Sequence, residues 1–186
     1  MRTPISYYGG KQNLAATILG LIPPHRLYCE PFIGGAAVFF AREPSKVEII
    51  NDTNGEIINF YEVLKRDFTA LEKEVAISLH SRKQHRQARV IYENPDLFDR
   101  VKRAWAVWVL ANGSYGCMLD GGFGYDRVGT TSRKLDNKRV SAPVRFAEIA
   151  AANPAGPAPA TSTSVSAKTG VSRSFSCTVF INLPVN

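Results

Sequence analysis

Cysteine and histidine are scarce in this 186-residue sequence, with three of each. The histidines show no ligand spacing with each other or with the cysteines. The cysteines are far apart and form no C-x-x-C pair: Cys29, Cys117 and Cys177. The sequence therefore indicates neither a disulfide framework nor a zinc site, and we expect no bound metal.

Long apolar runs are also missing. No segment approaches the ~20 apolar residues that a membrane-spanning helix needs. The N-terminus lacks the charged and then apolar regions of a signal peptide. We therefore expect a cytoplasmic protein with no membrane attachment. The length and the 45% hydrophobic content suit one globular domain with a sizeable core.

Positive charge is in excess, and it is unevenly placed. The net charge is +7, and residues 62–146 carry sixteen basic and ten acidic side chains, whereas residues 1–61 carry five of each. A basic block beside a neutral block favours a polyanionic partner, most simply nucleic acid. A solvated helical surface that happens to be basic is the open alternative.

A short glycine-containing stretch links a predicted strand to a predicted helix. Glu30-Pro31-Phe32-Ile33-Gly34-Gly35 follows an apolar strand at 27–29 and precedes an expected helix at 36–41. Such a strand-to-helix turn is typical of α/β proteins that bind nucleoside cofactors, because glycines let the backbone approach the ligand. The spacing is not G-x-G-x-x-G, so the stretch alone is a weak signal.

An acid at the end of the next predicted strand strengthens this interpretation. Asp52 follows the strand at 47–50 and lies 22 positions after Glu30. At this spacing an acid is typical of a site that binds ribose hydroxyls. The alternative is that Asp52 only caps the helix expected near Asn54.

The N-terminal loop and the middle of the chain carry further candidates. Residues 4–11 combine aromatic residues, glycines and Lys11, but the spacing is not that of a phosphate-binding P-loop. Helices are expected through 55–111, with Asp96 capping the last of them and Trp105 and Trp108 in the core. The glycine- and aromatic-rich loop at 112–130 suits base stacking, and a plain surface loop is the alternative.

After Asn153 the composition changes abruptly. The segment from 154 to 176 contains almost only small residues and proline, which predicts disorder. The last ten residues again resemble a strand followed by a turn.

Three blocks, in this order, resemble the Dam-like class of adenine-N6-specific DNA methyltransferases. Tyr7-Tyr8-Gly9-Gly10-Lys11 is similar to the opening motif of that family. Residues 30–39 resemble its E-P-F-x-G block, and residues 51–61 its D-x-N-x-x-[LI]-[IV]-x-x-Y block. The spacing agrees over residues 5–65, and the resemblance continues more weakly to about 146.

The resemblance implies a fold and a division of the chain. The expected fold is an α/β, Rossmann-like S-adenosylmethionine-dependent methyltransferase fold, incomplete, with an inserted and mainly helical target-recognition lobe. Residues 1–61 would form the cofactor-binding half, residues 62–146 the basic DNA-recognition lobe, and residues 147–186 an atypical tail.

The resemblance also implies a cofactor, S-adenosylmethionine. Tyr7 would contact its adenine, and Lys11 its carboxylate or the edge of the active site. Residues 30–35 would wrap the methionine and ribose, and Asp52 would bind the ribose hydroxyls. The expected cofactor-binding residues are Tyr7, Tyr8, Gly10, Lys11, Glu30, Pro31, Phe32, Gly34 and Asp52.

The implied partner is double-stranded DNA, methylated site-specifically at adenine N6. The expected DNA-binding residues are Asn112, Tyr115, Tyr125, Arg127, Arg133 and Lys134. The oligomeric state is not predicted.

The sequence departs from the family at the pocket for the target base. That pocket is built on D-P-P-Y, which this sequence does not contain. Asn182 and Pro184 are degenerate candidates for it. We therefore expect a truncated and impaired or inactive family member, and hypothesise a frameshift near residue 150. The alternative is a non-catalytic DNA-binding remnant. A dinucleotide-dependent oxidoreductase is a weaker third interpretation, because G-x-G-x-x-G is absent.

Overall fold

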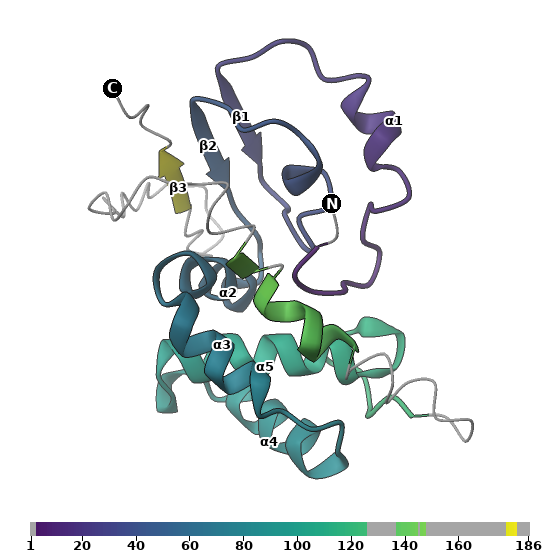
Figure 1. Cartoon of the computed structure of the whole chain (residues 1–186), viewed down its shortest axis with the longest axis vertical. Coiled ribbons are helices and arrows are strands. Elements are labelled where there is room, and N and C mark those ends of the chain that lie inside the picture. The colour runs from purple at the N-terminus through teal and green to yellow at the C-terminus, as the bar shows by residue number, and fades with distance from the viewer. Residues whose placement is uncertain (1–2, 126–136, 145, 148–177, 182–186) are drawn as a thin grey trace, which may run out of the picture.

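The computed structural model describes residues 3–125, 137–144, 146–147 and 178–181. In this part of the chain a small sheet lies beside a group of packed helices (Figure 1). The elements follow in the order α1 (Ala15–Leu19), β1 (Leu27–Glu30), η1 (Phe39–Ala41), β2 (Val47–Ile50), α2 (Gly55–Arg66), α3 (Phe68–Ala76), α4 (Arg82–Glu93), η2 (Pro95–Leu97), α5 (Arg100–Gly113), η3 (Tyr115–Cys117) and β3 (Thr178–Ile181). Residues 137–144 and 146–147 are also helical.

The sheet has the strand order β1-β2-β3. β1 and β2 are parallel, from Leu27 opposite Val47 to Glu30 opposite Ile50, and β3 runs antiparallel to β2. The two strands predicted at 27–29 and 47–50 are thus confirmed. Because parallel strands end at the same edge of a sheet, Glu30 and the loop after Ile50 lie next to each other. The small, partly parallel sheet agrees with an incomplete α/β fold.

The prediction of a helix at 36–41 is wrong. Only one 3₁₀ turn forms there, η1. Gly34 and Ala36 have φ angles of +47° and +57°, in the left-handed region. A residue in this region cannot continue a right-handed helix, and alanine adopts it only at a cost. The glycine stretch is therefore a compact loop and not the start of a long helix.

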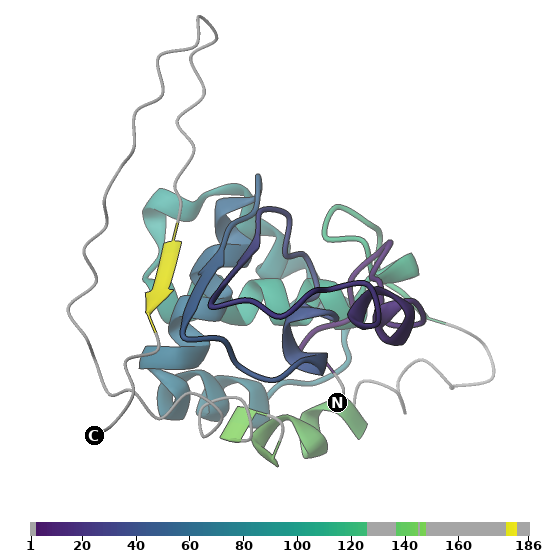
Figure 2. The same cartoon turned by 90° about the horizontal axis from the view of Figure 1, so that it is seen from above.

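The helices share one core, centred on α5. This helix packs against α2, α3 and α4. Trp105 and Trp108 are 7% and 1% exposed, so their predicted core position is confirmed. Phe146 is fully buried and meets the rings of Phe60 and Phe68 edge-on, which fixes the 137–147 helical segment against α2 and α3. Figure 2 shows this segment on the outside of the helical group.

Three of the described helices, α2, α4 and α5, begin at a side-chain cap. Asn54 caps α2, Ser81 caps α4 and Asp99 caps α5, each accepting backbone N–H groups through its side chain. The predicted cap at Asp96 is wrong, because Asp96 lies in η2 and α5 begins only at Arg100. None of the helices described here has the length and apolar character that crossing a membrane requires.

Ion pairs join α5 to the helices before it. Arg100 pairs with Glu62 at 2.7 Å, and Lys102 with Glu74 at 2.8 Å. Arg103 contacts Glu56 through two of its nitrogens. The predicted boundary between the 1–61 and 62–146 segments falls inside α2, so this helix contributes residues to both. The assignment of cofactor binding to the first segment and DNA recognition to the second remains a prediction.

Candidate functional site

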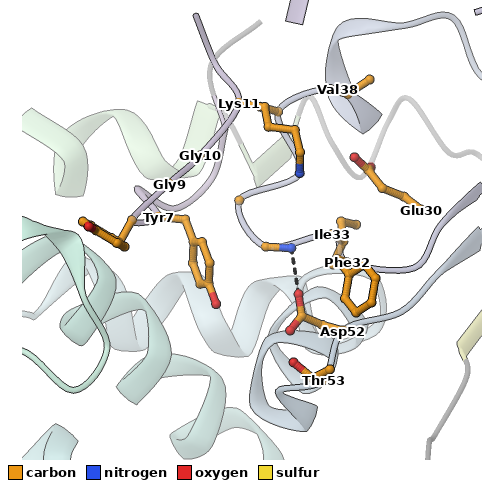
Figure 3. A pocket seen from close by; sticks show the side chains of 14 residues that line it. Tyr7, Gly9, Gly10, Lys11, Glu30, Phe32, Ile33, Val38, Asp52 and Thr53 are labelled. Carbon is orange, nitrogen blue, oxygen red and sulfur yellow. Dashed lines mark hydrogen bonds between the residues drawn. The ribbon is translucent and has the colours of Figure 1, made fainter. Parts of the chain in front are cut away.

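A pocket of about 280 Å³ lies at the carboxyl ends of β1 and β2 (Figure 3). The three sequence blocks meet there although they are far apart along the chain. The lining residues are Tyr7, Tyr8, Gly9, Gly10, Lys11, Glu30, Phe32, Ile33, Gly34, Gly35, Ala37, Val38, Asp52 and Thr53. Eight of the nine predicted cofactor residues are among them. Pro31 is not, and its carbonyl accepts a hydrogen bond from the Asn51 side chain at 3.3 Å.

Asp52 is held in place by two backbone groups. Its Oδ2 accepts the N–H of Gly34 at 2.9 Å, drawn as the dashed line in Figure 3, and its Oδ1 accepts the N–H of Asn54 at 2.9 Å. The cap of α2 is the Asn54 side chain, which accepts the N–H of Glu56. Asp52 is therefore not a helix cap, and each carboxylate oxygen keeps a further lone pair with which to accept a ligand hydroxyl.

The glycine loop is wedged between two tyrosines. A Cβ added at Gly34 or Gly35 would lie 3.1 Å or 3.0 Å from the Tyr7 side chain, so a larger residue at either position would require this side chain to shift. On its other side the loop is tied by the Tyr61 hydroxyl, which donates to the Gly34 carbonyl at 2.9 Å. Burial raises the pKa of Tyr61 well above its ordinary value, so this hydroxyl stays protonated as a donor.

A carboxylate and an ammonium group share one end of the pocket. Figure 3 shows Lys11 reaching over the glycine loop on the side of Glu30, with Asp52 on the other side of that loop. Burial raises the pKa of Glu30 to about 7, against the opposing influence of the charges on Lys11 and Arg42. Glu30 Oε2 is buried and has no hydrogen-bond partner within the described residues. A buried acceptor of this kind can take a hydrogen bond from a donor of a bound molecule or from water.

A second hollow, of about 410 Å³, adjoins the first and shares Tyr7 and Tyr8 with it. Asn54 and Tyr92 line it, and the Asn54 amide donates to the Tyr92 hydroxyl at 2.7 Å. The remaining lining residues are Cys117, Met118, Leu119 and Asp120. Sequence reasoning missed Asn54 and Tyr92 as site residues. Asn54 lies in the D-x-N block and offered a signal, whereas Tyr92 offered none.

The predicted DNA-binding residues separate into three groups. Asn112 is only 7% exposed, and its amide accepts the Ser6 N–H at 3.3 Å and donates to the Trp108 carbonyl at 2.8 Å. It joins α5 to the N-terminal loop, so a direct DNA contact would require breaking these bonds. Tyr115 and Tyr125 are 74% and 61% exposed. The remaining DNA-binding and catalytic candidates lie outside the described residues: Arg127, Arg133, Lys134, Asn182 and Pro184.

Unneutralised positive charge is concentrated on α4. The cations of α5 are paired with acids of α2 and α3, as described above. By contrast, Arg82, Lys83 and Arg86 are exposed and form no ion pair within the part of the chain that the structure describes. Within the described part of the 62–146 segment, α4 thus presents three exposed cations along one helix.

Comparison with known proteins identifies the family. The model of the family described as "D12 class N6 adenine-specific DNA methyltransferase" matches residues 7–107, more than half of the chain. "Type II methyltransferase M1.LlaDCHI" of Lactococcus lactis subsp. cremoris is 42% identical over 66 residues, which are 35% of this chain and 23% of that protein. "DNA N-6-adenine-methyltransferase" of Escherichia phage P1 is 34% identical over 70 residues, which are 38% of this chain and 9% of that protein.

The chain spans less than a quarter of each of these two relatives. The family match begins at Tyr7 and includes both the glycine stretch and Asp52, the same blocks that carry the resemblance in the sequence. The chain therefore belongs to the D12 class of N6 adenine-specific DNA methyltransferases.

Proposed function

We propose that the pocket at the carboxyl ends of β1 and β2 binds S-adenosylmethionine, and that the chain acts on adenine in double-stranded DNA. The observation that carries the cofactor assignment is the arrangement of charges. The amino-acid end of this cofactor is a zwitterion, so it needs an acceptor and a cation close together. Glu30 and Lys11 provide both at one end of the pocket.

The rest of the cofactor has matching partners on the other side of the glycine loop. Asp52 is fixed by Gly34 and Asn54, so its free lone pairs are already oriented for the two ribose hydroxyls. Tyr7 and Phe32 supply aromatic surface for the adenine and the apolar parts. A dinucleotide would leave the Glu30–Lys11 pair without a zwitterionic partner, which favours the methyl donor.

The contribution of this chain to methyl transfer is binding and orientation. The cofactor, when bound, supplies an electrophilic methyl group. Glu30 and Lys11 would hold the amino-acid end and Asp52 the ribose, so the methyl-bearing sulfonium that connects these two parts would be positioned from both sides. The tie from Tyr61 to Gly34 keeps this loop in place without a ligand. The site therefore needs little rearrangement on binding.

The DNA partner is supported by the α4 surface. Exposed, unneutralised cations are the groups that contact phosphates and release counterions. Arg82, Lys83 and Arg86 lie on the same helix, and the exposed aromatic residues Tyr115 and Tyr125 belong to the loop after α5. Cations beside exposed rings suit contact with both the backbone and the bases.

A second candidate function is a DNA-binding remnant that binds the cofactor without transferring its methyl group. The observation behind it is that D-P-P-Y, the motif on which the target-amine pocket of the resembled family is built, does not occur among these 186 residues.

Two measurements on the same preparation separate these functions. S-Adenosylmethionine is titrated into the full chain by calorimetry, and transfer of a labelled methyl group to unmethylated duplex DNA is then followed. Saturable binding with slow transfer supports the enzyme, and saturable binding without transfer supports the remnant. A folded protein that shows neither would refute the proposed function.

A further inference from the structure

Three aromatic rings and a guanidinium group are stacked beside the first turn of α4. The His80 ring is stacked on that of Phe123 with centroids 4.6 Å apart and planes inclined by 28°, and Phe123 is in turn nearly parallel to Tyr125, at 16° and 6.4 Å. The guanidinium carbon of Arg82 lies 4.5 Å from the centroid of Tyr125 and 5.3 Å from that of Phe123. We call these four residues the ring stack.

The loop that carries the ring stack is fixed by backbone hydrogen bonds. The N–H of Gly124 donates to the Gly113 carbonyl and that of Tyr115 to the Gly122 carbonyl, both at 2.8 Å. At Gly124 a Cβ would lie 3.0 Å from the backbone of Ser114, so this close approach requires glycine. The ring stack is therefore pre-organised, which lowers the entropy lost when a ligand binds.

A second tie connects the same loop to α4. The Ser114 hydroxyl is hydrogen-bonded to the His85 ring at 2.8 Å, and His85 is 7% exposed. The His85 ring also meets Phe123 edge-on, with centroids 5.6 Å apart. Phe123 is thus held from the protein side, while Tyr125, the outermost ring, remains 61% exposed.

The surroundings of the exposed ring are basic. Arg82, Lys83 and Arg86 project from the same helix and have no ion-pair partner among the described residues. None of the four ring-stack residues lines either the cofactor pocket or the hollow next to it. The ring stack is a separate feature that cofactor binding does not explain.

We propose that the exposed end of the ring stack binds one unpaired nucleobase of the DNA, with the α4 cations contacting the neighbouring phosphates. This proposal rests on the DNA partner proposed above. Bases within an intact duplex are covered on both faces by their neighbours, so only an unpaired base offers a free face for stacking on Tyr125. The Arg82 guanidinium lies over the rings of Phe123 and Tyr125, and this cation–π contact helps to hold the Tyr125 ring in place for stacking.

The test measures DNA binding by fluorescence anisotropy. One duplex is fully paired, and a second has the same sequence with one additional, unpaired 2-aminopurine. The wild-type chain should bind the second duplex about 5- to 150-fold more tightly, the range expected for stacking one base on an aromatic side chain. The 2-aminopurine fluorescence should also fall on binding, because stacking quenches it.

Substitutions of exposed residues separate stacking from charge. Tyr125→Phe keeps an aromatic ring and should retain both the preference and the quenching, whereas Tyr125→Leu should lose both. Arg82→Lys keeps the charge but loses the planar group, so it should weaken the preference more than the overall affinity. Circular dichroism checks that each variant folds as the wild type does.

The outcomes distinguish the ring-stack proposal from the proposal that DNA is the partner. Equal binding of both duplexes without quenching, or a preference that survives in Tyr125→Leu, would overturn the ring-stack proposal and leave the DNA partner intact. Absence of binding to either duplex at low salt would overturn the DNA partner, and the ring-stack proposal with it.

Discussion

Replacing Asp52 by asparagine tests the geometry of the cofactor pocket most sharply. The substitution keeps the size of the side chain but converts one carboxylate oxygen into an NH₂ group. Both oxygens of Asp52 accept backbone N–H groups, from Gly34 and Asn54, at 2.9 Å. Whichever way the amide is turned, one of these N–H groups therefore meets a donor.

The expected loss of cofactor affinity follows from the proposed ribose contact, because the NH₂ group replaces one oxygen that would accept a ribose hydroxyl. A hydrogen bond to a charged group contributes about 1.5–3 kcal/mol. Losing one such bond to the ribose corresponds to about 10- to 150-fold weaker binding of S-adenosylmethionine. Isothermal titration calorimetry at pH 7.2 measures this affinity directly in the wild type and in Asp52→Asn.

Asp99→Asn is the matched control. Asp99 also accepts two backbone N–H groups, those of Val101 and Lys102 at 2.9 and 3.0 Å, but it does so at the start of α5 and outside the pocket. The control makes the same change of charge and should leave cofactor affinity unchanged. A folded Asp52→Asn variant that binds the cofactor as tightly as the wild type would refute the ribose assignment.

Three further predictions follow from the same structure. With a pKa of about 7, Glu30 should be about 9% ionised at pH 6 and about 60% at pH 7.2. Cofactor affinity measured by calorimetry should thus rise about sevenfold over this range, and a similar rise in Glu30→Gln would contradict the role of the carboxylate. Tyr61→Phe leaves the Gly34 carbonyl without its donor and should lower the free energy of unfolding by about 1–2 kcal/mol in urea titrations; no change would show that this tie is not stabilising. Trp108→Ala, in the centre of the helical core, should cost about 3–5 kcal/mol in the same assay, and a cost below about 1 kcal/mol would contradict its placement there.

Much of the pocket at the carboxyl ends of β1 and β2 could be predicted from the sequence, because its strands and its glycine turn are each formed by neighbouring residues. Both strands were predicted from the sequence, and because parallel strands end at one edge of a sheet, their pairing places Glu30 and Asp52 at the same edge. The paired glycines after a predicted strand also indicated a turn, and in the structure Gly34 and Gly35 pack closely against the Tyr7 side chain.

Contacts between distant segments were not predictable in this way. Ser6 and Asn112 are 106 positions apart, and Asn54 and Tyr92 are 38 apart, yet each pair is hydrogen-bonded. No periodicity or spacing connects such residues, because their contact arises only when the helical core forms. The same core buries Asn112, which its glycine-rich neighbourhood had favoured as a DNA contact.

The pairing of charges and the backbone conformation of Ala36 are two further features that could not be predicted from the sequence. A count of basic residues does not reveal that the cations of α5 face acids of α2 and α3, while Arg82, Lys83 and Arg86 of α4 face solvent. Ala36 is a good helix former by propensity, and its left-handed conformation is imposed by the packing of the loop around it.

The most direct test of the account compares two ligands of the full chain at pH 7.2, by calorimetry. S-Adenosylmethionine carries both a ribose and an amino-acid zwitterion, whereas NAD carries ribose groups without the zwitterion. We expect saturable binding of S-adenosylmethionine at one site and much weaker binding of NAD, because only the former could engage Glu30 and Lys11 together with Asp52. Equal affinity for both ligands, or binding of NAD alone, would contradict the assignment of this pocket to a methyl donor.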